Sequence, residues 1–132
     1  LHKQVRTFKL IRFQSIEPGK TKFTRPDGFH ASDHLGKAWQ IIPEGREYKV
    51  ELLFESRVAT NVAEVRWHAT QEQEILPDGR CRMRFTVDGL NEIAWWICGY
   101  ADQVEVIKPA ALRKRVHDML QRAAERYAQP KG

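Results

Sequence analysis

Residues 48–87, YKVELLFESRVATNVAEVRWHATQEQEILPDGRCRMRFTV, decide the fold of this chain. The first eight alternate between apolar and mostly polar positions, which predicts a half-buried strand with an apolar face made of Tyr48, Val50, Leu52 and Phe54. Valines then recur at helical spacing, at positions 58, 62 and 65, behind Ser56 as a candidate helix N-cap. The stretch therefore begins as a strand followed by a helix.

The second half of this stretch predicts a hairpin. Two strand-like runs, QEQEIL and RCRMRFTV, flank Pro77-Asp78-Gly79, in which proline presets φ and glycine accepts a positive φ. Residues 90–100 then have helical periodicity up to Gly99, and VEVI at 104–107 predicts a last short strand. The order βαββαβ predicts an α+β, ferredoxin-like fold, with two helices on one face of the sheet and the other face open. We expect one core, made of Val50, Leu52, Phe54, Val62, Met83, Phe85, Ile93, Ile97 and Val106.

The two ends of the chain extend this domain. After Pro109, apolar residues at three- and four-residue steps predict an amphipathic, basic helix. At the front, VRTFKLIRF at 5–13 is a single strand-like run, and one strand cannot form a domain. We therefore expect residues 1–20 to hold the last one or two strands of an incomplete β domain, residues 21–44 to be a linker, and residues 45–128 to form the ferredoxin-like domain. The orphan strand and the basic helix both predict a homodimer.

Charge is distributed in blocks along the chain, whose net charge is +5. Residues 1–37 carry eight basic and three acidic residues, residues 38–107 carry seven and twelve, and residues 108–132 carry seven and two. A net negative centre disfavours a domain that coats DNA, so any anion site should be local or near the ends. No run approaches the roughly 20 apolar residues of a membrane span, so we expect a soluble, cytoplasmic protein.

Few residues are candidates for chemistry. Cys81 and Cys98 have neither CxxC spacing nor a partnering histidine cluster, so no disulfide framework, metal site or cofactor is expected. The Trp67-His68 pair could include a catalytic histidine, but no accompanying motif supports one. The hairpin arginines Arg80, Arg82 and Arg84 share one strand face. They predict either an anion surface or a sheet face neutralised by Glu51, Glu55, Glu72 and Glu74.

Several segments in this order resemble the C-terminal part of WYL-domain transcriptional regulators. They are VRTFKLIRF, YKVELLFESRVATNVAEVRWHATQ, LPDGRCRMRFTV and LNEIAWWICGYADQVEVIKPAALRKRV, with a last helix that ends near Tyr127. Residues 1 to about 17 resemble the tail of the WYL domain, a small Sm-like or SH3-like barrel. Residues from about 45 to 128 resemble the C-terminal extension called WCX. The Trp-Tyr-Leu triplet that names the barrel is absent from this chain.

The resemblance implies a sensor that is not an enzyme. The WYL barrel would sense a ligand, in some members single-stranded DNA or another nucleic-acid species, and the extension would dimerise. Promoter DNA would be bound only by a helix-turn-helix that is not expected within this chain. Arg6 and Arg12 match the family's R-x-F-x-x-x-R strand, which lines a basic pocket. Arg57, Arg66 and His68 match the first helix of the extension and its end, with Trp67 as a possible stacking surface for a base.

Three functions remain open at this point. The first is an effector-sensing and dimerisation module of a WYL-type regulator, with ligand contacts from Arg6, Arg12, Arg57, Arg66, Trp67 and His68. The second is a structural or protein-interaction domain with no ligand of its own. The third is a small enzyme that uses Asn61 or Asn91 beside an arginine, although neither asparagine lies in a glycine-rich phosphate loop.

Overall fold

The computed structural model describes residue 8 and residues 10–128, and it divides into two units between His34 and Leu35. The first unit contains a 3-10 turn, η1 (Leu10–Arg12), and the short helix α1 (Ala31–Leu35) begins in it. The strand expected at 5–13 is therefore wrong for Leu10–Arg12, and residues 5–7 and 9 lie outside the described residues. A strand needs a neighbour to pair its backbone, and within the described residues the sheet contains only strands from 47–108.

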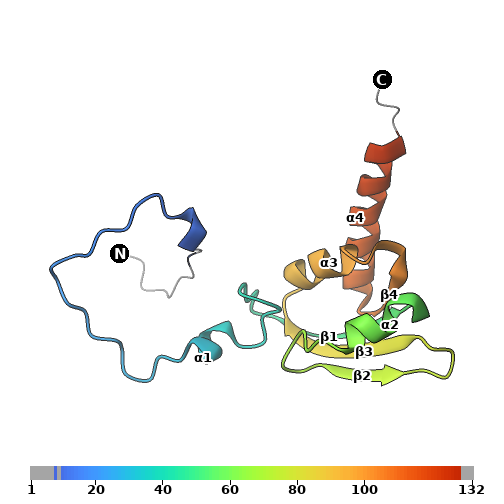
Figure 1. Ribbon diagram of the computed structural model, residues 1–132, viewed down its shortest axis with the longest axis horizontal. Coiled ribbons are helices and arrows are strands. Elements are labelled where there is room, and N and C mark those ends of the chain that lie inside the picture. The colour runs from blue at the N-terminus through green and yellow to red at the C-terminus, as the bar shows by residue number, and fades with distance from the viewer. Residues whose placement is uncertain (1–7, 9, 129–132) are drawn as a thin grey trace. The chain divides into compact units, whose positions relative to one another are not determined.

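The second unit contains the expected βαββαβ order (Figure 1). Its strands are β1 (Glu47–Phe54), β2 (Glu72–Ile75), β3 (Cys81–Asp88) and β4 (Val104–Lys108). Its helices are α2 (Ser56–Ala63), α3 (Asn91–Cys98), the 3-10 turn η2 (Ala101–Gln103) and α4 (Ala110–Ala128). The α+β prediction and the helix after Pro109 are confirmed. Ser56 is the first residue of α2 rather than its N-cap, which is Glu55.

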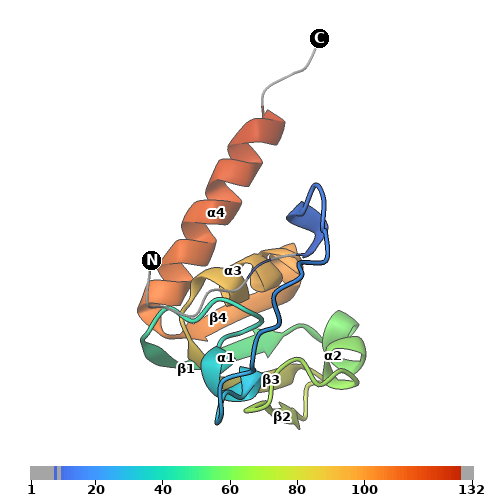
Figure 2. The same cartoon turned by 90° about the vertical axis from the view of Figure 1, so that its left-hand side faces the viewer.

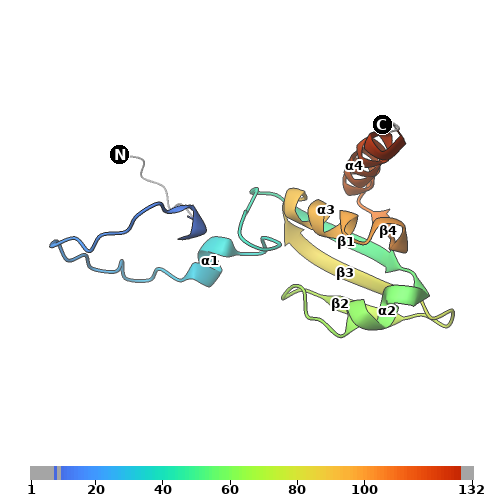
Figure 3. The same cartoon turned by 45° about the horizontal axis from the view of Figure 1, so that its top comes forward.

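The sheet has the strand order β2-β3-β1-β4, and all three pairings are antiparallel. Val50 lies opposite Phe85 and Leu52 opposite Met83, so the alternation of β1 and β3 brings their apolar residues to one face. Figure 3 shows α3 over this sheet and β2 at its edge. The Pro77-Asp78-Gly79 turn closes the hairpin, where Gly79 has a φ of 82° and Leu76 N–H donates to the Arg80 carbonyl at 2.8 Å.

One core lies between the sheet and the helices. All nine residues expected there are buried in it, and α4 adds Leu112 and Val116. The rest of α4 extends away from the sheet (Figure 2), and residues 121–128 are exposed. The core also contains Trp39, which lies in the segment expected to be a linker. The boundaries 1–20, 21–44 and 45–128 remain predictions, but residues 35–44 belong to the same unit as the sheet.

Candidate functional site

The open face of the sheet carries a row of alternating charge across all four strands. Glu72 of β2 lies opposite Arg84 of β3, Arg84 lies opposite Glu51 of β1, and Glu51 lies opposite Lys108 of β4. These side chains share a face because strand residues alternate between the two sides of a sheet, and their neighbours Phe85 and Val50 point into the core. The row is the polar counterpart of the core face.

Glu51 is the centre of this row. Its carboxylate lies 3.0 Å from Lys108 Nζ, 3.3 Å from Arg82 Nε and 3.5 Å from Arg84 Nε, and its side chain is only 12% exposed. The hydrogen bond from Lys108 lowers the pKa of Glu51, and the charges of Lys108 and Arg84 act in the same direction against the opposing effect of burial. Glu51 therefore remains a carboxylate and neutralises much of the positive charge around it.

The other hairpin arginine contacts are also with acids. Arg82 Nη1 lies 3.5 Å from Glu74, and Arg80 Nε lies 2.7 Å from Asp78 in the turn. Of the two interpretations of the hairpin arginines, the structure favours the neutralised sheet face. Glu51 and Glu74 are partners as expected, whereas no ion pair of Glu55 or Glu72 is present among the described residues.

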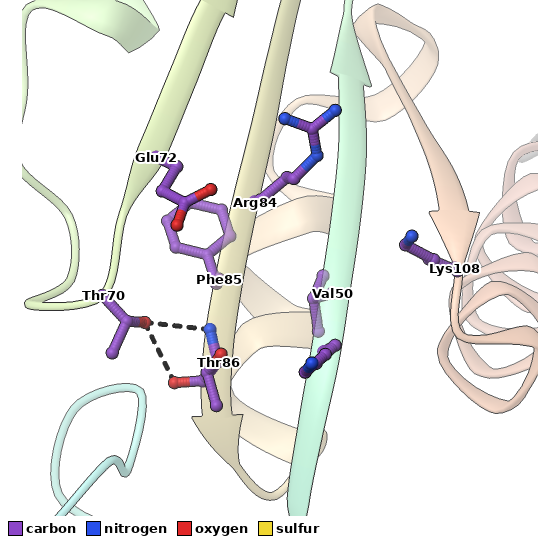
Figure 4. A pocket seen from close by; sticks show the side chains of 8 residues that line it. Val50, Thr70, Glu72, Arg84, Phe85, Thr86 and Lys108 are labelled. Carbon is purple, nitrogen blue, oxygen red and sulfur yellow. Dashed lines mark hydrogen bonds between the residues drawn. The ribbon is translucent and has the colours of Figure 1, made fainter.

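A hollow of about 290 Å³ lies on the same face, beside the charged row (Figure 4). Its lining consists of Lys49, Val50, Thr70, Glu72, Arg84, Phe85, Thr86 and Lys108. Thr70 Oγ1 donates to the Thr86 carbonyl at 3.0 Å and accepts from the Thr86 N–H at 2.9 Å. The hydroxyl of Thr70 thus satisfies the backbone N–H and carbonyl of Thr86, which lies on β3 just beyond its pairing with β2.

Arg57 and Arg66 lie near opposite ends of α2, and both are exposed. Arg66 Nη2 donates to the Ala69 carbonyl at 2.7 Å, and its side chain lines a second hollow of about 270 Å³ with Gln71 and Gln73. Neither arginine has a carboxylate partner among the described residues, in contrast to the hairpin arginines. The guanidinium group of Arg57 is therefore available to an anion, and that of Arg66 is available through the N–H groups that do not bind the Ala69 carbonyl.

Arg6 and Arg12 belong to the other unit of the chain. Arg12 is the last residue of η1 and is exposed, and it forms no ion pair within the described residues. Arg6 lies outside the described residues. Their role as ligand contacts stays a prediction.

Trp67 and His68, the other two expected ligand residues, pack into the interior of the domain. Trp67 is half-buried, its Nε1–H donates to the Val62 carbonyl at 2.9 Å, and its ring lies 5.1 Å from that of Trp96. His68 is 8% exposed, with Nε2 3.2 Å from the Ala38 carbonyl and Nδ1 2.8 Å from the hydroxyl oxygen of Thr70. Both ring nitrogens of His68 thus have protein partners, which leaves no nitrogen free to act on a ligand.

Three residues of this region, Lys49, Lys108 and Glu92, are not among the predicted site residues. Lys49 shares the strand face of Glu51, so strand alternation could have placed it beside the hollow. Lys108 could not be placed, because the register between β1 and β4 shifts between Glu51 and Leu52. Glu92 is buried on α3 and accepts backbone N–H groups from the segment at 40–42, and no local pattern marks such a contact.

Three further features bear on function: clusters of metal ligands, membrane-spanning helices and cysteine thiols. Across residue 8 and residues 10–128, no group of three or more His, Cys, Asp or Glu side chains is arranged to hold a metal ion. No helix in the described part of the chain is both long enough and apolar enough to cross a membrane. Cys81 and Cys98 are free thiols, and burial raises the pKa of each.

Comparison with known proteins places the domain. The model of the WCX domain matches residues 46–124. Among solved structures, the chain is similar to proteasome accessory factor B/C (PafBC) of Arthrobacter aurescens, with a TM-score of 0.54 and 22% sequence identity over 85% of this chain. The similar region makes up 16% of that protein, so the likeness concerns the fold of one part of it. No curated protein matches the chain in sequence. With the family match over more than half of its length, the chain belongs to the WCX domain family.

Proposed function

We propose that this chain is a non-enzymatic, effector-sensing and dimerisation module of a WYL-type transcriptional regulator that acts in the cytoplasm. The WCX match over residues 46–124 supports the regulator class, and the similarity to part of PafBC supports the fold. In this proposal promoter DNA is bound by a helix-turn-helix outside the chain. The place of His68 supports a non-enzymatic role, because its two ring nitrogens contact the Ala38 carbonyl and the Thr70 hydroxyl.

The proposed effector is a nucleic acid, such as single-stranded DNA, or a nucleotide. Its phosphates contact Arg57 and Arg66 of the WCX domain. Arg6 and Arg12, which belong to the other unit of the chain, are proposed as separate phosphate contacts. The observation that carries this assignment is the contrast between two sets of arginines: Arg57 and Arg66 are exposed without a carboxylate partner among the described residues, whereas Arg82 and Arg84 both contact Glu51. A free guanidinium binds phosphate through two parallel hydrogen bonds, while a paired one must first give up its carboxylate.

The test measures fluorescence anisotropy of a labelled short single strand with the full chain at several salt concentrations. We expect weak binding that falls steeply with salt, because each phosphate contact releases counterions. Replacing Arg57 and Arg66 together by alanine should weaken binding and reduce the slope of log K against log salt by about 1.4, at about 0.7 for each contact. Replacing Arg6 and Arg12 should have a similar effect.

The matched control is Arg82→Ala with Arg84→Ala, which removes the same number of positive charges. This variant should leave binding nearly unchanged and act mainly on stability. Binding that only the Arg82 and Arg84 changes abolish would contradict the assignment, as would tight, salt-insensitive binding to one duplex sequence.

The dimerisation part of the proposal rests on surfaces of α3 and α4. Trp95 of α3 is 61% exposed, although its neighbour Trp96 packs within the core. Residues 121–128 of α4 are exposed along a helix that extends beyond the sheet (Figure 2). The same surfaces support an alternative function, a protein-interaction domain with no ligand of its own. A chain that dimerises but binds no nucleic acid or nucleotide would favour this alternative.

A further inference from the structure

The hollow on the open sheet face points to a second ligand, distinct from a nucleic acid. We propose that it binds a small zwitterion, a molecule with one acidic group and one primary ammonium group separated by a short flexible chain. The acidic group lies at Lys49 and the ammonium lies at Glu72, while Arg84 and Lys108 between them are paired with Glu51. All four side chains line the hollow, and their placement and pairing determine which charges a ligand meets.

The two ends of the hollow lie on different strands. Lys49 of β1 is opposite Thr86 of β3, whereas Glu72 belongs to β2 on the other side of β3. Glu72 pairs with Arg84, two residues along β3 from Thr86, so the backbones that carry Lys49 and Glu72 are separated by roughly 10 Å across the sheet and about 7 Å along it, or roughly 12 Å in all. In Figure 4, Glu72 extends from β2 toward β3, and Lys108 extends from β4 toward β1. A bound molecule would thus lie diagonally across β3, between Thr86 and Arg84.

The charges at the two ends are unpaired, unlike the charges between them. Lys108 and Arg84 both contact Glu51, at 3.0 and 3.5 Å. Lys49 forms no ion pair among the described residues, because its cross-strand neighbour is Thr86 rather than an acid. Glu72 also lacks an ion pair there, because Arg84, its cross-strand neighbour, turns to Glu51. The hollow therefore offers one free cation and one free carboxylate, which are complementary to a zwitterion.

The floor of the hollow excludes a nucleobase as the preferred ligand. Phe85 and Val50 line the floor but are 2% and 1% exposed, so their side chains belong to the core. At the floor, a ligand would meet their backbone atoms and the side chain of Thr86. A base would find no aromatic ring on which to stack, and stacking is the main sequence-independent contribution to single-strand binding. Thr70 fixes the floor through its two hydrogen bonds to the Thr86 backbone.

Glu72 also distinguishes a zwitterion from a simple anion. Phosphate alone would gain from Lys49 but would be repelled by Glu72, whereas an ammonium at the other end of the ligand turns that repulsion into attraction. If the two side chains span about half of the roughly 12 Å between their backbones, the two ligand charges should be separated by roughly 6 Å. Aminoalkyl phosphates and ω-amino acids have this length.

The experiment uses isothermal titration of the full chain with O-phosphoethanolamine and with 4-aminobutyrate, compared with inorganic phosphate and with ethanolamine alone. We expect at least one zwitterion to bind ten times more tightly than either fragment. Lys49→Ala should weaken zwitterion binding at least tenfold. Glu72→Gln should weaken it at least fivefold but leave phosphate binding unchanged or stronger, because the repulsive charge is gone. The matched controls, Lys114→Ala and Glu64→Gln, change one charge each away from the hollow and should have no effect.

Nuclear magnetic resonance locates the binding independently. Titration of the isotope-labelled chain with the zwitterion should change the chemical shifts of the Lys49 and Thr86 backbone amides more than those of the α2 amides. The proposal fails if neither zwitterion binds, if phosphate alone binds as tightly, or if Glu72→Gln leaves the ratio of zwitterion to phosphate affinity unchanged. These outcomes are separate from the nucleic-acid test, which depends on arginines that do not line this hollow.

Discussion

The indole ring of Trp39 stacks on the imidazole ring of His68, with ring centroids 5.7 Å apart and planes within 5° of each other. The same indole lies 4.7 Å from the ring of Trp96 and meets Phe85 edge-on at 5.1 Å. His68 also contacts the Ala38 carbonyl through Nε2. The segment before β1 is therefore part of the domain core. His68, which follows α2, holds it there through its contacts with Ala38 and Trp39.

Trp39→Ala should be among the most destabilising single changes in this chain. Removing a buried tryptophan leaves a large cavity, so we expect a loss of about 3–5 kcal/mol in the free energy of unfolding, measured by urea denaturation. Trp95→Ala removes the same side chain from a position that is 61% exposed and should change stability by less than about 1 kcal/mol. A loss for Trp39→Ala as small as the one expected for Trp95→Ala would show that Trp39 contributes little through burial.

The sheet and its core could be predicted because they depend on local periodicity. The alternation in β1 and β3 and the helical spacing in α2 and α3 are visible in short windows, and nine expected core residues are buried. Trp39 could not be placed in this way. It lies between short irregular segments, and its partners His68, Phe85 and Trp96 are far away in sequence.

The site could be predicted only where strand register determines the contacts. Cross-strand pairing of β1 with β3 gave Glu51 as a partner of the hairpin arginines, and the structure confirms it. The hollow could not be predicted, because Thr70 and Lys108 reach it from outside regular pairing and from beyond a register shift. The burial of His68 likewise depends on Ala38 and Trp39, thirty residues earlier.

Glu92 should hold the segment before β1 in place. Its carboxylate accepts N–H groups from Gln40, Ile41 and Ile42 at 3.0, 3.2 and 3.1 Å, and the side chain is buried. Hydrogen bonds to a charged group are stronger than neutral ones, so Glu92→Gln should cost about 1–3 kcal/mol. Hydrogen exchange of the amides at 40–42 should become faster relative to that of the β1 amides. Unchanged exchange at these amides would contradict the assigned role, and Glu64→Gln at an exposed position is the control.

Glu51 should make stability depend on acidic pH. Since its pKa in the folded protein is lowered, its contribution is complete above its ordinary value of about 4.5 and is lost as the pH falls through the lower folded value. Glu51→Gln should therefore be less stable than the unchanged chain at pH 7, by about 1–2 kcal/mol. The difference should shrink as the pH is lowered from 4.5. Chemical denaturation at a series of pH values measures this, and a difference that stays constant down to acid unfolding would contradict the prediction.

Trp95 should contribute to self-association. A tryptophan that is 61% exposed on a helix otherwise packed into the core leaves a large apolar surface in water, and aromatic side chains of this kind are enriched at interfaces. If two copies bury this ring, Trp95→Lys should shift the chain toward the monomer at least tenfold in dissociation constant, because a lysine charge would have to be buried in its place. Sedimentation velocity over a range of concentrations measures the constant.

The control is Tyr127→Lys, which places the same charge on another exposed aromatic position, near the end of α4, and separates the α3 surface from the distal part of α4. A monomer at all concentrations would contradict self-association altogether. A dimer weakened only by Tyr127→Lys would instead place the interface on the distal part of α4.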